Sequence, residues 1–577
     1  MSLRSLRPLS RWLVSAFVAL QVPVAGAASV APVASDEGMV VTAQHLATRV
    51  GADVLASGGN AVDAAVAVGY ALAVVYPAAG NLGGGGFMTL HLADGRQTFI
   101  DFREKAPLAA TADMYLGADG NVVKGRSTVG HLAVAVPGTV AGLELALARY
   151  GTQPRARLIA PAIRLAERGF VLESGDARMF EVVGDSLRQD PATAAIFTRR
   201  GEPWRAGDRL VQKDLATTLR RISARGVDGF YRGPTARAIA AASEAGGGLI
   251  READLRAYEA RERTPVGCDY RGYRIVSAPP PSSGGVVVCE ILNILEGYPL
   301  KELGFRAAQS VHYQIEAMRH AYMDRNSYLG DPDFVTNPLE RLLDKTYAAR
   351  IREVIDPARA GVSSDIRPGT PPHEGSNTTH YSIADRFGNA VAVTYTLNEW
   401  FGAKVTAAGT GVLLNNEMDD FTAKRGVPNA YGLVQGDANA IAPGKRPLSS
   451  MSPTILTRDG KPVMVVGTPG GSRIITTVVH TILNVVDYGM DIQEAVDAPR
   501  FHQQWLPDLT NVEPRAFSPD TQRLLEGMGH RFGKPQDANH IAAILIGGPS
   551  LAPSPAGTPR FHGANDPRRG TGLAKGP

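Results

Sequence analysis

Two adjacent threonines, Thr378 and Thr379, stand where a polar linker meets a predicted strand. The segment 363–376 before them is rich in proline and polar residues, whereas THYSIAD and AVAVTYTLN alternate with period two around a turn at 386–389. This pattern predicts a β-hairpin that begins at the threonine pair. Cutting the Asn377–Thr378 bond would leave Thr378 with a free α-amine, whose pKa of about 7.7–8.0 suits it as the base for the adjacent hydroxyl. The segment therefore predicts an N-terminal nucleophile; the alternative is a surface linker that runs into an ordinary strand.

Two further features could bind negative charge. Gly470 and Gly471 follow a predicted strand and precede a helix that ends at Gly489. Free backbone N–H groups at such a helix start favour an anion or an oxyanion, although a glycine turn without a ligand fits equally well. Arg103 comes directly after an apolar strand, and its guanidinium could hold a carboxylate, unless it forms a surface salt bridge.

The elements around these residues follow from hydrophobic periodicity. A helix is predicted over 45–57, and a second, apolar on all sides, runs from Asn60 to Pro77 and should be buried. The glycine run 83–86 lacks the Gly-Lys-Ser/Thr of a phosphate-binding loop, so we expect close backbone packing there. The region 139–350 is mostly helical in pattern, the chain after residue 377 is rich in strands, and the long polar loop 425–436 is a candidate lid.

The N-terminus predicts export. Three arginines precede an apolar run that ends in Ala25-Gly26-Ala27, which predicts a secretory signal peptide at 1–27; the alternative is an uncleaved membrane anchor. Its removal would lower the net charge from +4 to +1, so the basic pI gives no support for nucleic-acid binding.

The two cysteines could form one disulfide, although Cys289 lies in an apolar run typical of core packing. We expect no metal site, since His312 and His320 lack the spacing of metal ligands.

Seven motifs occur in an order that resembles the bacterial γ-glutamyltranspeptidases. They are GNLGGGGF, DFRE, TTHYS, NEMDDF, PLSSMSPT, GTPGGSRII and GANDPRR, and the similarity extends from about residue 36 to 574. The resemblance implies an α+β fold, a four-layer αββα sandwich of the N-terminal-nucleophile hydrolase type. It also implies one domain formed by two autoprocessed subunits, a large one (28–377, with a flexible linker at 361–377) and a small one (378–577).

The resemblance also implies roles for individual residues. Thr378 would be the nucleophile, assisted by Thr396, and the N–H groups of Gly470 and Gly471 would hold the oxyanion. Tyr431 would close the lid by bonding the Asn398 side chain. The matching substrate residues are Arg103, Ser449 and Ser450 for the α-carboxylate of a γ-glutamyl group, and Asn398, Glu417 and Asp420 for its α-amine.

The implied activity is cleavage of γ-glutamyl amides such as glutathione, with transfer to water or to amino acid and peptide acceptors. We expect the two subunits to form a heterodimer in the periplasm or outside the cell. No cofactor, nucleic-acid partner or stable membrane span after signal removal is expected.

The alternatives to this activity are a cephalosporin (glutaryl) acylase of the same family and an exported protein that binds γ-glutamyl compounds without catalysis. Glu417 stands where some bacterial members have glutamine, which leaves an acceptor for an ammonium group in place.

Overall fold

Two seven-stranded antiparallel sheets form the centre of the molecule. The computed structural model describes residues 29–363, 378–535 and 539–577. The described residues leave out the predicted signal peptide and residues 364–377 of the predicted linker. These include Asn377, which directly precedes the expected cleavage point.

The first sheet has the order β20-β2-β10-β11-β3-β4-β7, and the second has the order β1-β19-β18-β15-β14-β9-β8. The strands of the first sheet are β20 (Leu573–Lys575), β2 (Gly38–Thr42), β10 (Thr378–Asp385), β11 (Ala390–Thr396), β3 (Gly85–His91), β4 (Gln97–Phe102) and β7 (Arg261–Arg263). Those of the second are β1 (Val33–Ser35), β19 (Phe561–Asn565), β18 (Ala542–Ile546), β15 (Lys461–Gly467), β14 (Thr454–Arg458), β9 (Tyr273–Ser277) and β8 (Val266–Tyr270).

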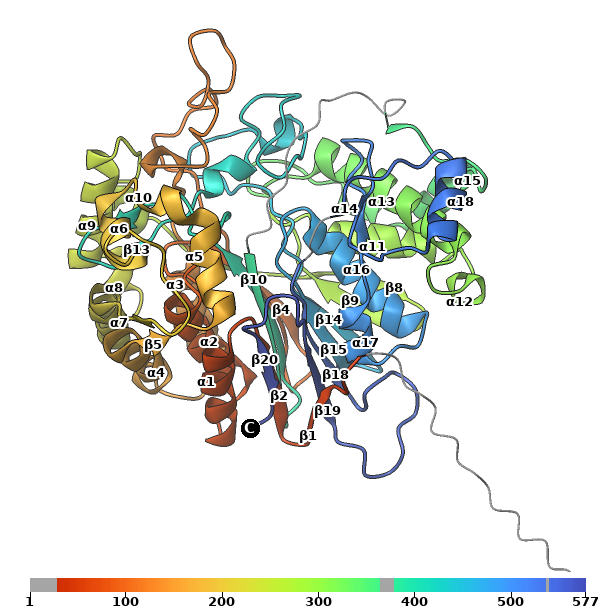
Figure 1. Cartoon of the computed structure of the whole chain (residues 1–577), viewed down its shortest axis with the longest axis horizontal. Helices are drawn as coiled ribbons and strands as arrows, with labels where there is room; N and C mark the ends of the chain where they lie inside the picture. Colours follow the sequence, from red (N-terminus) through yellow and green to blue (C-terminus); the bar gives the residue numbers. More distant parts are fainter. Residues whose placement is uncertain (1–28, 364–377, 536–538) are drawn as a thin grey trace, which may run out of the picture.

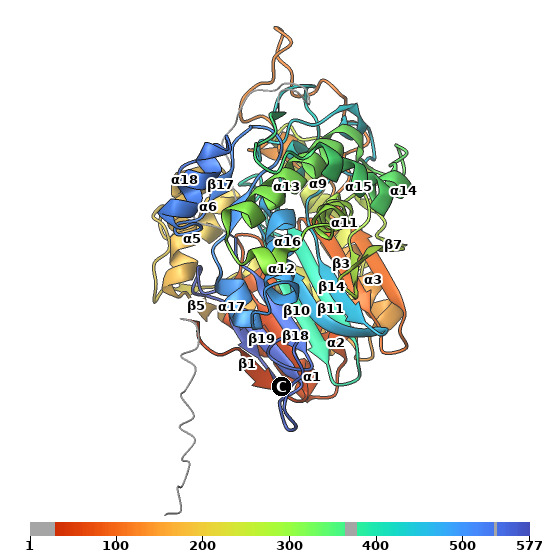
Figure 2. The ribbon, with the colours of Figure 1, turned by 90° about the vertical axis from the view of Figure 1, so that its right-hand side faces the viewer.

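Helices cover the outer face of each sheet, so the layers run helix, sheet, sheet, helix (Figure 1). On the first sheet lie α1 (His45–Ala56), α2 (Ala61–Val75) and α3 (Thr139–Tyr150), with α4 (Arg155–Arg168) beyond them. On the second sheet lie α11 (Gly284–Leu295), α16 (Arg473–Val486) and α17 (Ile492–Asp497), seen beside the strands in Figure 2, with α13 (Ala308–Tyr328) packed against α11. The predicted four-layer αββα sandwich is confirmed.

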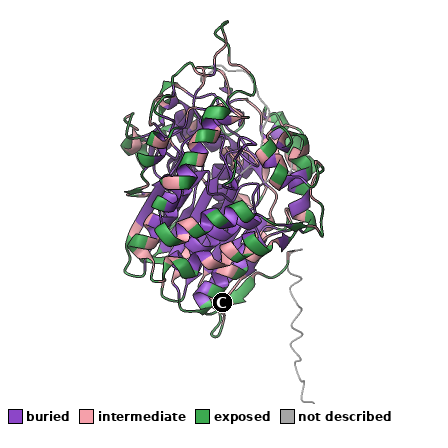
Figure 3. Cartoon of the chain, turned by 90° about the vertical axis from the view of Figure 1, so that its left-hand side faces the viewer, coloured by how far each residue is buried: buried purple, intermediate pink, exposed green. Residues whose placement is uncertain are grey.

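Each interface between layers has its own apolar core. Small and branched residues such as Val41, Ala392 and Ile544 meet between the two sheets. The outer cores separate the sheets from their helices, and Figure 3 shows buried residues throughout the strands and exposed stripes on the surface helices. As its apolar sequence predicts, α2 is buried along its whole length, and Asn60 and Asp63 form a capping box at its start.

The first sheet mixes strands from both sides of residue 377. The hairpin β10–β11 inserts between β2 and β3, in continuous register from Thr378↔Thr396 to Ala384↔Ala390. The hairpin predicted at the threonine pair is therefore confirmed, and it begins at Thr378 itself. Because central strands of one sheet come from both segments, the two segments share one domain rather than forming two.

The glycine run 83–86, whose last two residues begin β3, permits close backbone contact, as predicted. A Cβ on Gly84 would lie 1.9 Å from the Thr396 carbonyl oxygen, and one on Gly86 would lie 2.4 Å from the Thr394 carbonyl oxygen. Both contacts are shorter than any side chain tolerates, so this stretch requires glycine beside the last residues of β11.

Two features add to the sequence prediction. The region 139–350, predicted to be mostly helical, also supplies the hairpin β8–β9, whose turn at Arg271 and Gly272 lies at the edge of the second sheet. Cys289 is buried as predicted, and it forms a disulfide with Cys268 that joins α11 to β8.

None of the described helices has the length and apolar character needed to cross a membrane.

Candidate active site

A buried pocket opens at the start of β10, beside the end of β11 and the N-terminus of α16. Its open volume, which includes space open to solvent, is about 310 Å³. The residues that line it come from segments before and after residue 377, and they include Arg103, Arg325, Thr378, Thr396, Asn398, Glu417, Asp420, Tyr431, Ser449, Ser450, Gly471 and Ser472.

Strand pairing places two threonines side by side in this pocket. Thr378 is the first residue of β10 and pairs with Thr396, the last residue of β11. Thr378 is buried, and the Thr396 hydroxyl accepts a hydrogen bond from the Asn398 amide at 2.8 Å. The backbone ladder of the sheet therefore sets the position of the Thr378 hydroxyl.

Alternation along β10 decides which threonine faces the pocket. Thr379 points to the opposite face of the sheet, where the next residue on that face, Tyr381, donates to the Ala65 carbonyl of α2 at 3.1 Å. Thr378 shares its face with His380, whose ring nitrogens lie 2.8 Å from the Thr394 hydroxyl and 3.0 Å from the Ser382 hydroxyl. Burial, with a smaller effect of His540, lowers the pKa of His380 to about 3. This histidine is neutral and its nitrogens are engaged, so it is a poor candidate for the base.

The glycine pair forms the turn between β15 and α16, as predicted. Gly470 has φ +135° and Gly471 has φ +56°, backbone conformations that favour glycine. Among the described residues neither amide N–H has a hydrogen-bond acceptor. Gly471 lines the pocket, whereas Gly470 contacts Asn539 behind it. The N–H groups precede a helix start, where negative charge is favoured.

The other end of the pocket is charged. Arg103 is fully buried and its guanidinium pairs with Glu417 and Asp420, both in the short helical turn η3 (Glu417–Asp420). Its Nη1 also lies 3.5 Å from Glu104, and its Nε donates to the Pro447 carbonyl at 3.1 Å. The sequence assigned Arg103 to one end of a substrate and the two acids to the other, whereas the structure pairs them directly.

Burial shifts the pKa values of these acids upward. It raises the pKa of Glu104 to about 7 and that of Glu417 well above its usual value, against the lowering effect of Arg103. The pKa of Asp420 is raised by burial as well. Burial would lower the pKa of Arg103, but its carboxylate neighbours outweigh that effect, so the arginine stays charged.

An arginine that sequence reasoning missed lies beside the predicted serines. Arg325 of α13 donates to the Ser450 hydroxyl at 3.0 Å and to the Ser283 hydroxyl at 3.0 Å, and it lines the pocket. The Ser449 hydroxyl accepts from the Met451 amide at 3.1 Å. Burial lowers the pKa of Arg325 to about 10, so it remains a cation at neutral pH. No motif surrounds Arg325; the only signal was a basic residue on the buried side of a helix.

Tyr431 closes one side of the pocket. Its hydroxyl donates to the main-chain carbonyl of Asn398 at 2.8 Å. The prediction that it would bond the Asn398 side chain is therefore wrong, because that amide donates to the Asn416 carbonyl at 2.9 Å instead. The Tyr431 ring covers Gly471 so closely that a Cβ on that glycine would lie 2.3 Å from the ring. The loop 425–436 thus reaches both the Asn398 backbone and the glycine turn.

The structure brings all the predicted site residues to one place. All except Gly470 line the pocket, and Gly470 is adjacent to Gly471. Arg325 and Glu104 are additions that sequence reasoning did not make. The arrangement combines a hydroxyl on a fixed strand, backbone donors at a helix start and a buried cluster of opposite charges.

Comparisons with known proteins agree with this geometry. Residues 47–575 match the family model described as Gamma-glutamyltranspeptidase. The chain is 70% identical over 551 residues to the glutathione hydrolase proenzyme of Pseudomonas sp. (strain A14), covering 95% of this chain and 96% of that protein. It is 51% identical over 547 residues to the glutathione hydrolase proenzyme of Escherichia coli (strain K12), covering 94% and 93%. Among solved structures, it is similar to the cephalosporin acylase from Bacillus halodurans, with a TM-score of 0.81, 28% identity and coverage of 94% of this chain and 96% of that one.

Proposed function

Because this chain belongs to the γ-glutamyltranspeptidase family, we propose that Thr378 is the nucleophile with which it cleaves γ-glutamyl amides such as glutathione. The chain is an enzyme of that family with the N-terminal-nucleophile hydrolase fold. The γ-glutamyl group passes to water in hydrolysis and to the amine of an amino acid or peptide in transfer.

Maturation precedes catalysis in this proposal. The Thr378 hydroxyl attacks the carbonyl carbon of Asn377, the peptide becomes an ester, and water hydrolyses that ester to separate the two chains. Before this cut the Thr378 nitrogen is an amide and cannot accept a proton; afterwards it is an α-amine with a pKa of about 7.7–8.0. The pairing of Thr378 with Thr396 supports a role for the second threonine in orienting this hydroxyl.

The catalytic cycle then uses the new amine as a base. It takes the proton of the Thr378 hydroxyl as the oxygen attacks the γ-carbonyl carbon of the donor, and the N–H groups of Gly470 and Gly471 receive the developing oxyanion. The proton goes to the leaving amine, which departs and leaves a γ-glutamyl ester on Thr378. Water or an acceptor amine then attacks the ester and restores the threonine. Each oxyanion donor of this kind contributes about 10²–10³-fold to the rate.

The charged end of the pocket suits the zwitterionic end of a γ-glutamyl group. Arg103, Ser449 and Ser450 would hold the α-carboxylate, whereas Asn398, Glu417 and Asp420 would hold the α-ammonium. In the free protein Arg103 pairs with Glu417 and Asp420. A bound zwitterion can replace part of these pairs with its own charges, so no buried charge loses its partner.

The observation that carries the proposal is the place of Thr378. It is the first residue of a central strand, it directly follows the expected cleavage point, and it lines the same pocket as Gly471 and the charged cluster. The neighbouring Thr379 provides a matched control, because it is also a buried threonine but lies on the opposite face of β10.

The test is a denaturing gel and mass spectrometry of the wild type, Thr378→Ala and Thr379→Ala, with a γ-glutamyl anilide as substrate. We expect chains of 28–377 and 378–577 for the wild type and for Thr379→Ala. Thr378→Ala should remain one chain and be inactive. Cleavage of Thr378→Ala at the same bond in a protease-deficient host would show that an outside protease does the work.

A second candidate activity is that of a glutaryl acylase, which the similarity to the cephalosporin acylase from Bacillus halodurans raises. Glutaryl groups lack the α-amine, so they bring no cation to replace Arg103 beside the acids when their carboxylate draws on that arginine. The buried pair Glu417 and Asp420 therefore favours γ-glutamyl substrates. Comparing a glutaryl with a γ-glutamyl version of one chromogenic amide distinguishes the two activities.

We also propose that the enzyme is exported and acts in the periplasm or outside the cell. The signal-peptide pattern of residues 1–27 supports this location. The Cys268–Cys289 disulfide supports it independently, since disulfides persist in oxidising compartments. The two chains of the processed enzyme would stay together, because β10 and β11 are central strands of the first sheet.

A further inference from the structure

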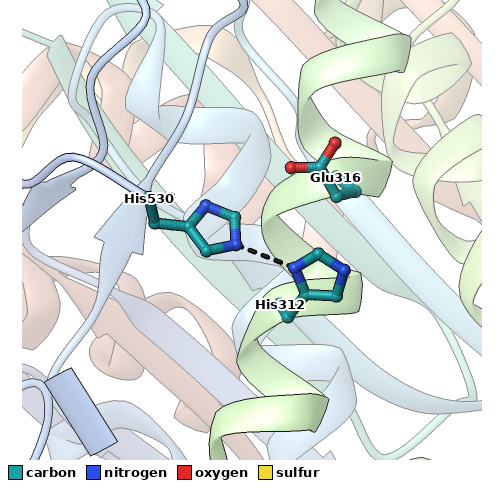
Figure 4. Close-up of side chains that lie close together, drawn as sticks. All are labelled: His312, Glu316 and His530. Atoms are coloured by element: carbon teal, nitrogen blue, oxygen red, sulfur yellow. Dashed lines mark hydrogen bonds between the residues drawn. The ribbon is translucent and has the colours of Figure 1, made fainter. Parts of the chain in front are cut away.

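A cluster of metal-ligating side chains lies in the helical layer over the second sheet. His312 and Glu316 project from successive turns of α13, and His530 approaches them from the segment after α18 (Pro519–Gly527), as Figure 4 shows. One ligand atom from each residue lies within 4.8 Å of the others, and all three residues are buried. The sequence predicts no metal site, because His530 is far from α13 along the chain and its place beside His312 is not visible there.

The hydrogen bonds of His312 leave one ring nitrogen directed at the other two residues. Its Nε2 lies 2.8 Å from the main-chain carbonyl oxygen of Asp356. A carbonyl only accepts, so Nε2 carries the hydrogen and Nδ1 presents its lone pair. Nδ1 lies 2.8 Å from Nε2 of His530. Histidines that bind metals generally donate their second N–H to a carbonyl or carboxylate in this way.

We propose that Nδ1 of His312, Nε2 of His530 and the Glu316 carboxylate form a site for a divalent transition-metal ion of the zinc class. Two imidazoles and one carboxylate are a donor set that zinc accepts in proteins. Ligands at about 2.0–2.1 Å from a tetrahedral ion lie about 3.3 Å apart, so the two rings must separate by roughly half an ångström. The hydrogen that now lies between them must then move to Nδ1 of His530.

The charges around the cluster leave Glu316 available to the ion. Arg319 lies 3.3 Å from Glu316, but it also pairs with Asp508. The arginine charge is therefore shared between two carboxylates. A nearby cation lowers the affinity for a second one, so the two imidazoles must supply much of the binding.

The cluster joins the two chains that processing would produce. His312 and Glu316 precede residue 377 and His530 follows it, so this step rests on the proposed cleavage. The last described residues before the cleavage point are held in the same place: the Ser363 amide donates to Asp508 at 3.0 Å, and the Ala360 amide donates to the Met528 carbonyl at 2.8 Å. A metal ion here would fasten the end of the large chain to the small chain.

The site is separate from the pocket. Glu316 and Arg325 are nine residues apart on α13, which corresponds to about 13–14 Å along a helix. The ion is therefore expected to stabilise the association of the chains and not to contact the substrate.

The direct test is titration of the chelator-treated wild-type protein with Zn²⁺ against a chromophoric chelator. We expect about one Zn²⁺ per molecule, and Co²⁺ in its place should give the intense visible bands of a low-symmetry, four-coordinate site. The Co²⁺ spectrum uses the unaltered protein, so it does not depend on whether a variant folds. Absence of stoichiometric Zn²⁺ binding by the wild type would overturn the proposal.

Variants identify the ligands. His530→Gln and Glu316→Gln should weaken Zn²⁺ binding by at least about tenfold, whereas His320→Gln, one turn beyond Glu316 on α13 and outside the cluster, should bind like the wild type. Zn²⁺ should also raise the urea concentration at which the two chains separate in the wild type and in His320→Gln, but not in His530→Gln. Equal Zn²⁺ affinity of His530→Gln and the wild type would refute the site.

The two proposals fail separately. If the chain stays uncut, the proposed maturation is wrong, yet Zn²⁺ stoichiometry and the Co²⁺ spectrum still test the site on the single chain. If the chain is cut and active but binds no Zn²⁺, only the metal site is wrong.

Discussion

The two ends of the pocket are built by different means. At the nucleophile end, the pairing of β10 with β11 fixes Thr378 and Thr396, and the turn before α16 fixes Gly471. At the charged end, side chains from separate segments meet, and ion pairs hold Arg103 against the acids of η3. Backbone hydrogen bonds position the first end, whereas charge neutralisation positions the second.

This difference matters for how each end tolerates change. A strand in the middle of a sheet cannot shift by one residue without turning every side chain to the opposite face. Ion pairs between side chains can exchange partners when a ligand brings its own charges. We therefore expect substitutions at the nucleophile end to act mainly on kcat, and substitutions at the charged end to act mainly on KM.

Among the substitutions that leave Thr378 in place, the largest effect should come from Gly471→Ala. The new Cβ would lie 2.3 Å from the Tyr431 ring at a backbone φ of +56°, so the turn must move and its N–H groups with it. We expect kcat for a γ-glutamyl anilide to fall by about 10²–10³-fold. Gly489→Ala is the matched control, because φ there is +67° but nothing lies within 4 Å of the new Cβ. An unchanged kcat in Gly471→Ala would remove this turn from the oxyanion site.

Arg103→Lys tests the charged end. Lysine keeps the charge but loses the planar fork that reaches Glu417 and Asp420 together. We expect KM for the donor to rise by about 10–100-fold, as for loss of one charged hydrogen bond, while cleavage before Thr378 continues. Arg261→Lys, at a half-exposed ion pair, is the control. A fall in kcat at constant KM would contradict the division between the two ends.

Asp420→Asn sharpens the same test. It should weaken γ-glutamyl binding more than glutaryl binding, because only the first substrate has an α-ammonium. The measurement is kcat/KM for both versions of one chromogenic amide. Equal losses would mean that Asp420 does not recognise the amine.

Glu104→Gln tests the cost of burying acids around Arg103. Burial raises the pKa of Glu104 from 4.5 to about 7, so between these pH values the folded chain binds more protons than the unfolded chain. The contribution of Glu104 to the free energy of unfolding therefore falls as pH rises through this window. Glu104→Gln should remove that fall and raise the free energy of unfolding at pH 8 by up to about 3 kcal/mol, with little change near pH 4.5. Urea unfolding at both pH values measures it, with the exposed Glu353→Gln as control; equal pH dependence in Glu104→Gln and the wild type would contradict it.

The smallest effect should come from Tyr431→Phe, which links the two ends. It removes the hydrogen bond to the Asn398 carbonyl and keeps the ring over Gly471. Loss of about 0.5–1.5 kcal/mol corresponds to a rise of a few-fold in KM and a changed ratio of transfer to hydrolysis, measured with and without glycylglycine. Tyr347→Phe loses a hydrogen bond to Asp324, but neither residue lines the pocket, so both quantities should stay unchanged. No change in Tyr431→Phe would mean that this hydrogen bond controls neither donor binding nor the access of acceptors.

The sequence alone determined much of the local structure. Period-two alternation predicted the β10–β11 hairpin and its start at Thr378, and apolar content predicted the buried helix α2. The order of the motifs predicted the four-layer fold and the residues of the pocket. These features depend on neighbours along the chain, or on short motifs whose residue types suit one backbone geometry.

Only the tertiary structure decided which distant residues touch. It paired Arg103 with Glu417 and Asp420, brought Arg325 to Ser450, joined Cys268 to Cys289 and placed His530 beside His312. It also showed that Tyr431 bonds the Asn398 backbone and not its side chain. Each of these contacts depends on how sheets and helices pack across long sequence separations, and local periodicity carries no information about the partner that packing supplies.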